Sequence, residues 1–406
     1  MLKIIKYILL LLLLALIAFS YHPLFLSAEL ESLNQANPLT RYISILTLVL
    51  IVLSLNFKAL LKDRFVRRFI ITISYIILIG LFFLLFETST NFIHEAISIG
   101  MALAFIIIGY NFNISQNSFI LISLIFSFLI IFTGVAQVME SIGAFVIEDL
   151  YLVIGKNSLG VIIASLLAFT LQLSFSPPKI PFQKVLRFLC VVISIVFIIL
   201  ILTIRARTSA VAVIPIALIA AIKSDNFTKR RIFIIALIII IITFLPNDYG
   251  LSEVRSFVSS SFIQNHEDDF SSGRNERLIE AFQIIRQYPT FGRINTDIDI
   301  EWIHNYLIRV MTDYGFIGGF FLIYLYLYLV LFVIKGLLSK DNYHFYYIGL
   351  LCMLSPIVSS LTEPTFPYAP GSATFYAYWA FGIFLKHNTI RRDNIAGNNP
   401  IICKLI

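Results

Sequence analysis

The sequence predicts an all-α, polytopic membrane protein: a bundle of about twelve transmembrane helices interrupted by one long polar loop. Hydrophobic residues make up 59% of 406 positions and charged residues only 13%, whereas a soluble domain has roughly 45 to 50% apolar and 25% charged residues. The net charge of +7 does not indicate a nucleic-acid partner, because the basic residues form short clusters between apolar runs rather than one polar face. The chain is therefore expected to be surrounded by membrane lipids.

Twelve apolar runs approach the length of about 20 residues that a helix needs to cross the hydrocarbon. They cover residues 4–19, 42–61, 69–86, 93–110, 118–138, 159–175, 185–204, 209–222, 232–245, 315–334, 346–361 and 374–385. The long polar stretch, residues 247–301, falls between the ninth and tenth runs. We expect one integral membrane domain over residues 1–406, with 247–301 inserted in it as a partly helical extracytoplasmic loop.

The positions of lysine and arginine predict the orientation, since short loops rich in these residues stay in the cytoplasm. With both termini in the cytoplasm, the inner segments carry 20 of the 30 basic residues and only four of the 23 acidic residues. The polar loop then lies on the outer side.

The first apolar run also fits a secretory signal. Lys3 and Lys6 precede it, and Ala18-Phe19-Ser20 resembles a small-x-small cleavage site. The orientation of the remaining helices is the same whether or not this run is cleaved.

Arg205 and Arg207 break the pattern, because they fall at the outer ends of the seventh and eighth runs. An arginine near the hydrocarbon costs on the order of 2.5 to 3.5 kcal/mol on insertion scales. One interpretation is that both side chains snorkel to the outer headgroups. The other is an anion site, because a guanidinium group stays charged and its planar fork matches phosphate oxygens.

A helix is predicted inside the polar loop, capped by Ser272 and ended by Pro289. Its apolar residues recur at helical spacing and define one face: Leu278, Ala281, Phe282 and Ile285. Arg274 lies in its first turn, where backbone amides together with this side chain could hold an anion. A solvated helix start is the alternative.

His304 precedes a second short helix, predicted over residues 302–313, and the chain enters the next apolar run at Gly315. A single histidine is often structural, but its ordinary pKa of about 6.5 also suits proton abstraction near neutral pH. His304 is therefore the candidate general base.

Asp297, Asp299 and Glu301 alternate in the loop, and hard cations take carboxylate ligands. Such a run, like the acidic stretch at 266–269, is most often simply a solvated loop, and no metal is expected. The three cysteines are far apart in the sequence, so they predict neither a disulfide framework nor a metal cluster.

Five short motifs occur in a fixed order. They are Arg207-Thr208-Ser209-Ala210, Ser272-Gly273-Arg274, the Pro289–Gly292 turn, His304-Asn305-Tyr306-Leu307 and Gly315-Phe316-Ile317-Gly318. In this order the chain resembles the O-antigen ligase and polymerase family, bacterial membrane glycosyltransferases that act on polyprenyl-diphosphate-linked glycans. The resemblance covers about residue 185 to the end, and the chain departs from it at Ile294, where members commonly have a second glycine.

The resemblance implies a metal-independent, inverting transfer at the periplasmic face of the bacterial inner membrane, without a cofactor. The donor would be a glycan on undecaprenyl diphosphate and the acceptor a sugar hydroxyl. Arg207 and Arg274, with Arg205, would stabilise the departing diphosphate, and His304 would activate the acceptor hydroxyl.

Three functions are consistent with these features. The leading one is a ligase that transfers the glycan to lipid A-core in lipopolysaccharide biosynthesis, and the second is a polymerase that joins lipid-linked repeat units. The third, a transporter or flippase of lipid-linked sugars, is disfavoured because the ionisable residues gather at the outer end instead of the bilayer midplane.

Overall fold

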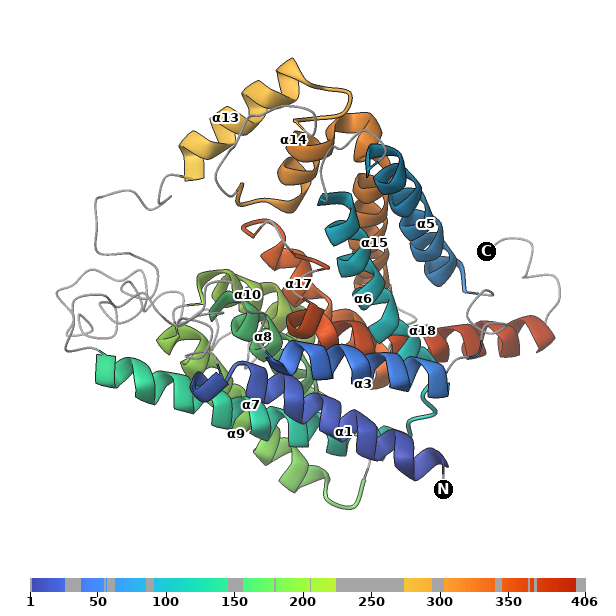
Figure 1. The fold of residues 1–406 in the computed structure, drawn as a ribbon. Helices are drawn as coiled ribbons and strands as arrows, with labels where there is room; N and C mark the ends of the chain where they lie inside the picture. The colour runs from blue at the N-terminus through green and yellow to red at the C-terminus, as the bar shows by residue number, and fades with distance from the viewer. Residues whose placement is uncertain are drawn as a thin grey trace.

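The part of the chain that the computed structural model describes is built of helices, turns and short loops, without a strand. It comprises residues 2–25, 38–54, 56, 63–84, 91–144, 156–178, 180–204, 206–223, 274–293, 303–339, 345–363, 366–368 and 371–398. The first helices are α1 (Leu2–Ser20), α3 (Pro38–Ser54), α5 (Arg64–Leu84), α6 (Asn91–Asn111), α7 (Gln116–Ala144), α8 (Lys156–Phe175), α9 (Gln183–Thr203) and α10 (Arg207–Ile222). They are followed by α13 (Arg274–Gln287), α14 (Tyr306–Gly318), α15 (Phe320–Leu338), η2 (Phe345–Tyr347), α16 (Ile348–Cys352), α17 (Leu354–Ser359) and α18 (Gly371–Asn398) (Figure 1).

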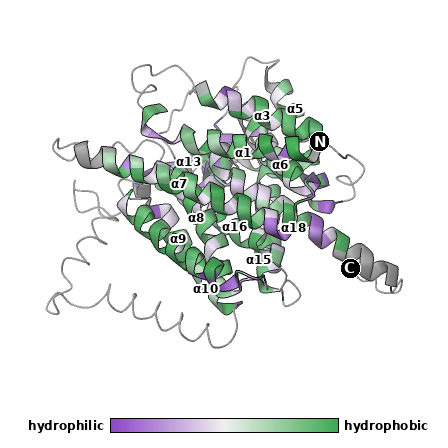
Figure 2. Ribbon diagram, turned by 90° about the horizontal axis from the view of Figure 1, so that it is seen from below, coloured by the Kyte–Doolittle hydropathy of each residue, from purple (hydrophilic) through white to green (hydrophobic). Residues whose placement is uncertain are grey.

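Four helices among the described residues are long and apolar enough to cross a membrane: Gln116–Met139, Asn157–Phe175, Gln183–Thr203 and Phe320–Leu338. Shorter apolar helical stretches are Ile4–Ser20, Leu39–Ser54, Glu95–Asn111, Arg207–Ile222 and Phe345–Ser359. Figure 2 shows hydrophobic residues along most of these helices. The all-α class is confirmed, whereas a bundle of twelve crossing helices stays a prediction.

The predicted apolar runs fall mainly on helices in the described parts of the chain, and the run at 232–245 lies outside the described residues. Two runs are broken in a way that the sequence analysis did not predict. The run at 315–334 starts inside α14 and continues as α15, and the run at 346–361 is divided among η2, α16 and α17.

The break between α16 and α17 follows from Pro356. Proline has no amide hydrogen, so it cannot donate to the carbonyl of Cys352 four residues earlier. The hydroxyl of Ser165 in α8 donates mainly to the carbonyl of Val161 in its own helix, at 2.9 Å, and lies 3.4 Å from the carbonyl of Cys352. A polar side chain of a neighbouring helix thus lies beside the carbonyl that lacks its backbone donor.

α8 lies at the centre of the bundle: 83% of the most apolar stretch of this helix is buried inside the protein. Hydroxyl groups join it to its neighbours: Ser194 of α9 donates to Thr170 at 2.8 Å, and Ser355 of α17 donates to the carbonyl of Val161 at 2.9 Å. Small and hydroxyl-bearing residues let apolar helices approach closely and hydrogen-bond across the interface.

α9 is apolar on all sides but covered on only one. Phe188, Ile195 and Ile199 are exposed, whereas Ile193 and Phe197 are buried. A helix with apolar side chains all round suits either a protein interior or a membrane, so the uncovered face of α9 is a surface expected to contact lipid.

Basic side chains gather at one end of the bundle. Lys223, just after α10, donates to the carbonyl of Ser339, just after α15, at 2.7 Å. Thr389 of α18 donates to Asp63, which precedes α5, at 3.2 Å. We refer to this as the basic end; its cations are Arg64, Arg67, Arg68, Arg187, Lys223, Lys335 and Lys386.

The helix predicted in the polar loop is present as α13, which packs on α14 (Figure 1). Its termini agree with the predicted start near Gly273 and with termination by Pro289. Ala281 and Ile284 are buried, whereas Phe282, predicted on the same apolar face as Ala281, is 50% exposed. The buried face of α13 is therefore rotated away from Phe282 relative to the predicted one.

The second short helix, α14, begins later than the predicted residue 302. Asn305 caps it, accepting a hydrogen bond from the amide of Ile308 at 3.0 Å. An asparagine at this position satisfies an otherwise unpaired amide of the first turn, and therefore sets the helix start.

Candidate functional site

Two turns at opposite ends of the segment that contains α14 are hydrogen-bonded to each other near the junction of α14 and α15. The amide of Phe316 donates to the carbonyl of Pro289 at 2.8 Å, and the amide of Ile317 donates to the carbonyl of Thr290 at 2.9 Å. The Pro289–Gly292 and Gly315–Gly318 motifs, which the sequence analysis identified separately, therefore form one unit.

Glycine is required on both sides of this contact. Gly292 has φ of +63° and Gly315 has φ of +66°, a backbone region that other residues enter only at a cost. A Cβ on Gly315 would lie 2.5 Å from the amide nitrogen of Gly292, and a Cβ on Gly292 would lie 2.5 Å from the carbonyl oxygen of Thr312. The turns approach so closely that neither position has room for a side chain.

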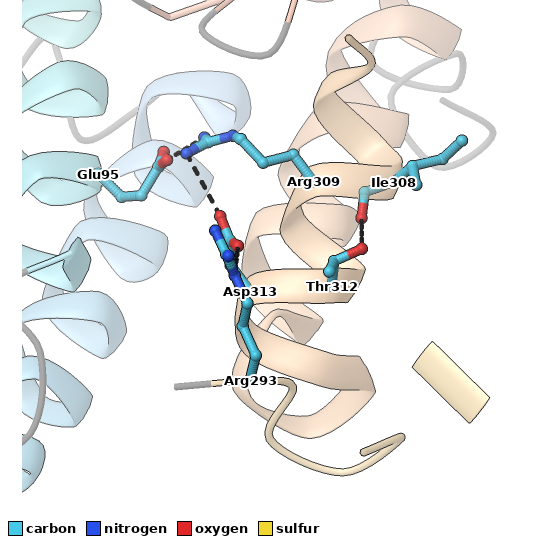
Figure 3. Close-up of polar contacts among 6 residues, drawn as sticks. All are labelled: Glu95, Arg293, Ile308, Arg309, Thr312 and Asp313. Carbon is cyan, nitrogen blue, oxygen red and sulfur yellow. Dashed lines mark hydrogen bonds and ion pairs between the residues drawn. The ribbon is translucent and has the colours of Figure 1, made fainter. Parts of the chain in front are cut away.

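A chain of alternating charges adjoins this junction (Figure 3). Arg309 of α14 pairs with Glu95 of α6, and its guanidinium also lies 3.8 Å from the carboxylate of Asp313. Arg293, next to the turn after α13, donates to the other oxygen of Asp313 at 2.8 Å. Three segments, α6, α14 and the 289–293 turn, are thus tied by one partly buried ionic network.

The protonation states of Arg309 and of two tyrosines of α14, Tyr306 and Tyr314, are fixed by burial and by the charges of this network. Burial alone lowers the pKa of Arg309, but Glu95 and other nearby groups outweigh burial and raise the pKa, so the guanidinium stays protonated. Burial raises the pKa of Tyr306 and Tyr314 well above the ordinary tyrosine value, and Glu95 adds to the increase. Both phenols are therefore neutral.

His304 lies in the loop that leads into α14, and this loop is attached to the end of α17. The amide of Tyr306 donates to the carbonyl of Ser360 at 2.9 Å. The side chain of Asn305 donates to the carbonyl of Leu361 at 3.1 Å. Residues 360–363, which follow α17, therefore fix the backbone on the carboxyl side of His304.

The same segment contacts the start of α10, where Arg207 lies. The hydroxyl of Thr362 donates to the hydroxyl of Thr208 at 2.9 Å. Asn157 at the start of α8 donates to Glu363 at 2.8 Å. The sequence neighbours of Arg207 and His304 thus bind adjacent residues of one short segment, so both candidates belong to the same end of the bundle, which we call the polar end.

The remaining predicted site residues are less completely described. Arg274 opens α13, whereas Arg205 lies outside the described residues, as does the capping residue Ser272. The acidic run of Asp297, Asp299 and Glu301 and the stretch at 266–269 lie outside them too. Within the described ranges, no group of three or more His, Cys, Asp or Glu side chains is placed to hold a metal ion.

Several residues that build this end were not predicted from the sequence. Glu95 was counted within an apolar run, Arg309 received no role, and Thr362 and Glu363 lie just beyond a predicted span. A single signal was available for Glu95: a carboxylate inside an apolar helix needs a partner. Nothing in the sequence identified Arg309, 214 positions away, as that partner.

These features define a helical protein with apolar helices of membrane-spanning length and a polar end built from several distant parts of the chain. No protein-family model matches the sequence. No curated protein matches it either.

Proposed function

We propose that this protein is an O-antigen ligase-like glycosyltransferase of the bacterial inner membrane. It would transfer a glycan from undecaprenyl diphosphate to a sugar hydroxyl of lipid A-core. The observation that carries the proposal is the 360–363 segment, which contacts Thr208 beside Arg207 and Asn305 beside His304. The two residues whose types suit diphosphate binding and proton abstraction are thereby attached to one scaffold.

The arrangement of charge supports the orientation of this enzyme. Lysine and arginine of the basic end are expected in the cytoplasm, so the polar end, with His304 and Arg207, would face the periplasm, where lipid-linked glycans are transferred. The full set of twelve crossing helices, with both termini in the cytoplasm, belongs to this proposal.

The transfer proposed is an inverting displacement at the anomeric carbon. His304 takes the proton of the acceptor hydroxyl as its oxygen forms the new bond to that carbon. The bond from the anomeric carbon to the diphosphate oxygen breaks, and its electron pair leaves with undecaprenyl diphosphate. Arg207 and Arg274, together with Arg205, stabilise the charge that develops on the leaving group, so a metal ion is not needed for this role.

The direct test is the glycolipid ladder of a deletion strain on a gel. Lipid A-core without polymer, together with accumulated lipid-linked chains, is the result expected for a ligase. Core that carries a single repeat unit would assign the polymerase activity instead. Lipid-linked units that accumulate only in the cytoplasmic leaflet would assign a flippase, and an unchanged ladder would remove all three functions.

The mechanism is tested with purified protein and lipid-linked donor. Transfer is expected to continue in excess chelator. Loss of transfer in chelator and its restoration by a divalent cation would contradict the metal-independent mechanism and would direct attention to Asp297, Asp299 and Glu301.

A further inference from the structure

A cavity of about 360 Å³ lies between α5 and α15, away from the residues assigned to transfer. Arg64, Arg67 and Arg68 from the first turns of α5 line it. The described residues that line the cavity include no carboxylate; the neighbouring Asp63 accepts hydrogen bonds from the amides of Phe65 and Val66. The lining therefore carries a net positive charge, which favours an anion.

The cavity has a charged half and an apolar half because α5 and α15 run antiparallel. The rings of Phe65 and Phe332 are 5.1 Å apart at the start of α5, and those of Tyr75 and Phe321 are 4.1 Å apart farther along it. The lining residues Phe320 and Phe321 thus belong to the end away from Arg64. The result is an amphipathic groove.

Aromatic rings hold one of the arginines in place. The guanidinium carbon of Arg68 lies 3.8 Å from the ring centroid of Tyr328 and 5.8 Å from that of Tyr324. A cation over an aromatic face is stabilised without being neutralised. Arg68 therefore keeps its full charge while its position is fixed.

Thr72 supplies a second, independent sign of a ligand. It lines the cavity, is 1% exposed, and its hydroxyl has no hydrogen-bond partner among the described residues. Thr47, a comparable threonine in α3, donates instead to the carbonyl of Ile43 at 2.7 Å. A buried hydroxyl left without a partner is unfavourable, and an oxygen atom of a bound molecule would satisfy it.

We propose that this groove binds a lipid with a phosphate-bearing headgroup. The phosphate contacts Arg67 and Arg68, Thr72 donates to a headgroup or ester oxygen, and the apolar chain lies along Phe320 and Phe321. Free phosphate would leave the aromatic half uncovered, and a neutral lipid would bring no negative charge to Arg67 and Arg68. The site is at the basic end and does not depend on the proposed transfer activity.

Native mass spectrometry of the full-length protein in neutral detergent tests the site. The added probes are phosphatidylglycerol, phosphatidylcholine, a polyprenyl phosphate and inorganic phosphate. Phosphatidylglycerol is expected to be retained over phosphatidylcholine, and inorganic phosphate at equal concentration is not expected to displace it. Stronger retention of the polyprenyl phosphate would identify the ligand as a carrier lipid, and stronger retention of phosphatidylglycerol would identify it as bulk phospholipid; both results support the site.

The double variant Arg67→Gln/Arg68→Gln is expected to reduce retention of the phosphate-bearing lipid by about 10-fold to 30-fold, given the usual contribution of each basic residue near a membrane surface. The matched control is Lys6→Gln/Lys184→Gln, which removes the same charge from the predicted cytoplasmic side outside the groove. Equal loss in both double variants, or equal retention of phosphatidylglycerol and phosphatidylcholine by the unmodified protein, would overturn the proposal.

The Thr72→Val variant tests the site even if the arginine double variant fails to fold. Because the hydroxyl has no partner among the described residues, the lipid-free melting temperature is expected to stay the same or to rise. Lipid retention is expected to fall by about 2-fold to 10-fold, the contribution of one hydrogen bond. A valine variant that retains lipid fully would show that Thr72 does not contact the ligand and would overturn the assigned binding mode.

Discussion

The polar end and the basic end use charge in opposite ways. At the polar end opposite charges meet: Arg309 pairs with Glu95, and Arg293 pairs with Asp313. At the basic end, arginines of like charge gather around a cavity in which no carboxylate is described. The difference separates charges that are paired within the protein from like charges that line a cavity, which the proposal above assigns to a ligand of opposite sign.

The largest expected effect is the loss of transfer rate when the proposed general base, His304, is replaced. His304→Ala is expected to reduce transfer by about 100-fold to 10,000-fold, the usual contribution of general-base catalysis, while membrane insertion is unchanged. His387→Ala is the control, because His387 stacks on Tyr346 beside Lys386 at the basic end. Initial rates with lipid-linked donor measure both variants, and comparable losses in the two would abolish the functional distinction between the ends.

Arg207→Ala is expected to lower the rate of transfer by about 100-fold to 1,000-fold, the loss typical for one group that stabilises a developing negative charge. Arg286→Ala removes an equal charge from an exposed position of α13 and serves as the comparison. Near-normal turnover by the Arg207 variant would mean that its side chain only snorkels to the headgroups.

Gly315→Ala tests the contact between the two turns at the polar end by its effect on the stability of the protein. The left-handed backbone and the 2.5 Å approach to Gly292 predict a loss on the order of 3 kcal/mol in the free energy of unfolding. Gly100→Ala in α6 is the matched control, since nothing lies within 4 Å of the added Cβ. Melting of the detergent-solubilised protein distinguishes the two, and equal melting temperatures would show that the turns are not locked.

The smallest effect is expected for the ionic network. Glu95→Gln removes one charge-assisted partner of Arg309 and is expected to cost about 1.5 to 3 kcal/mol. Glu280→Gln, on the exposed side of α13, is expected to melt like the unmodified protein. In a double-mutant cycle with Arg309→Gln, simple additivity of the two losses would exclude a direct interaction between the pair.

The helices themselves could be predicted, because hydrophobic runs and the capping and proline signals are local. The end of α13 before Pro289 is an example. Pro356, the cause of the break between α16 and α17, was also visible in the sequence, whereas the position of the Ser165 hydroxyl beside the carbonyl of Cys352 was not.

The candidate site was predicted only in part. Arg207 and His304 stand out as residue types that break an apolar pattern, and each could be identified without knowing its neighbours. The 360–363 segment could not, because its role depends on contacts to Thr208 and Asn305, which are 154 and 56 positions away along the chain. Pairings over such separations are set by tertiary packing, which periodicity does not encode.

The locked turns have one more consequence. The first amides after Gly315, those of Phe316 and Ile317, donate to the carbonyl oxygens of Pro289 and Thr290. These amides form the positive end of the helix dipole that begins here, and because they are already hydrogen-bonded within the protein they cannot bind a pyrophosphate. In the proposed transfer, backbone amides that hold a pyrophosphate must therefore come from another helix start, such as the first turn of α13 at Arg274.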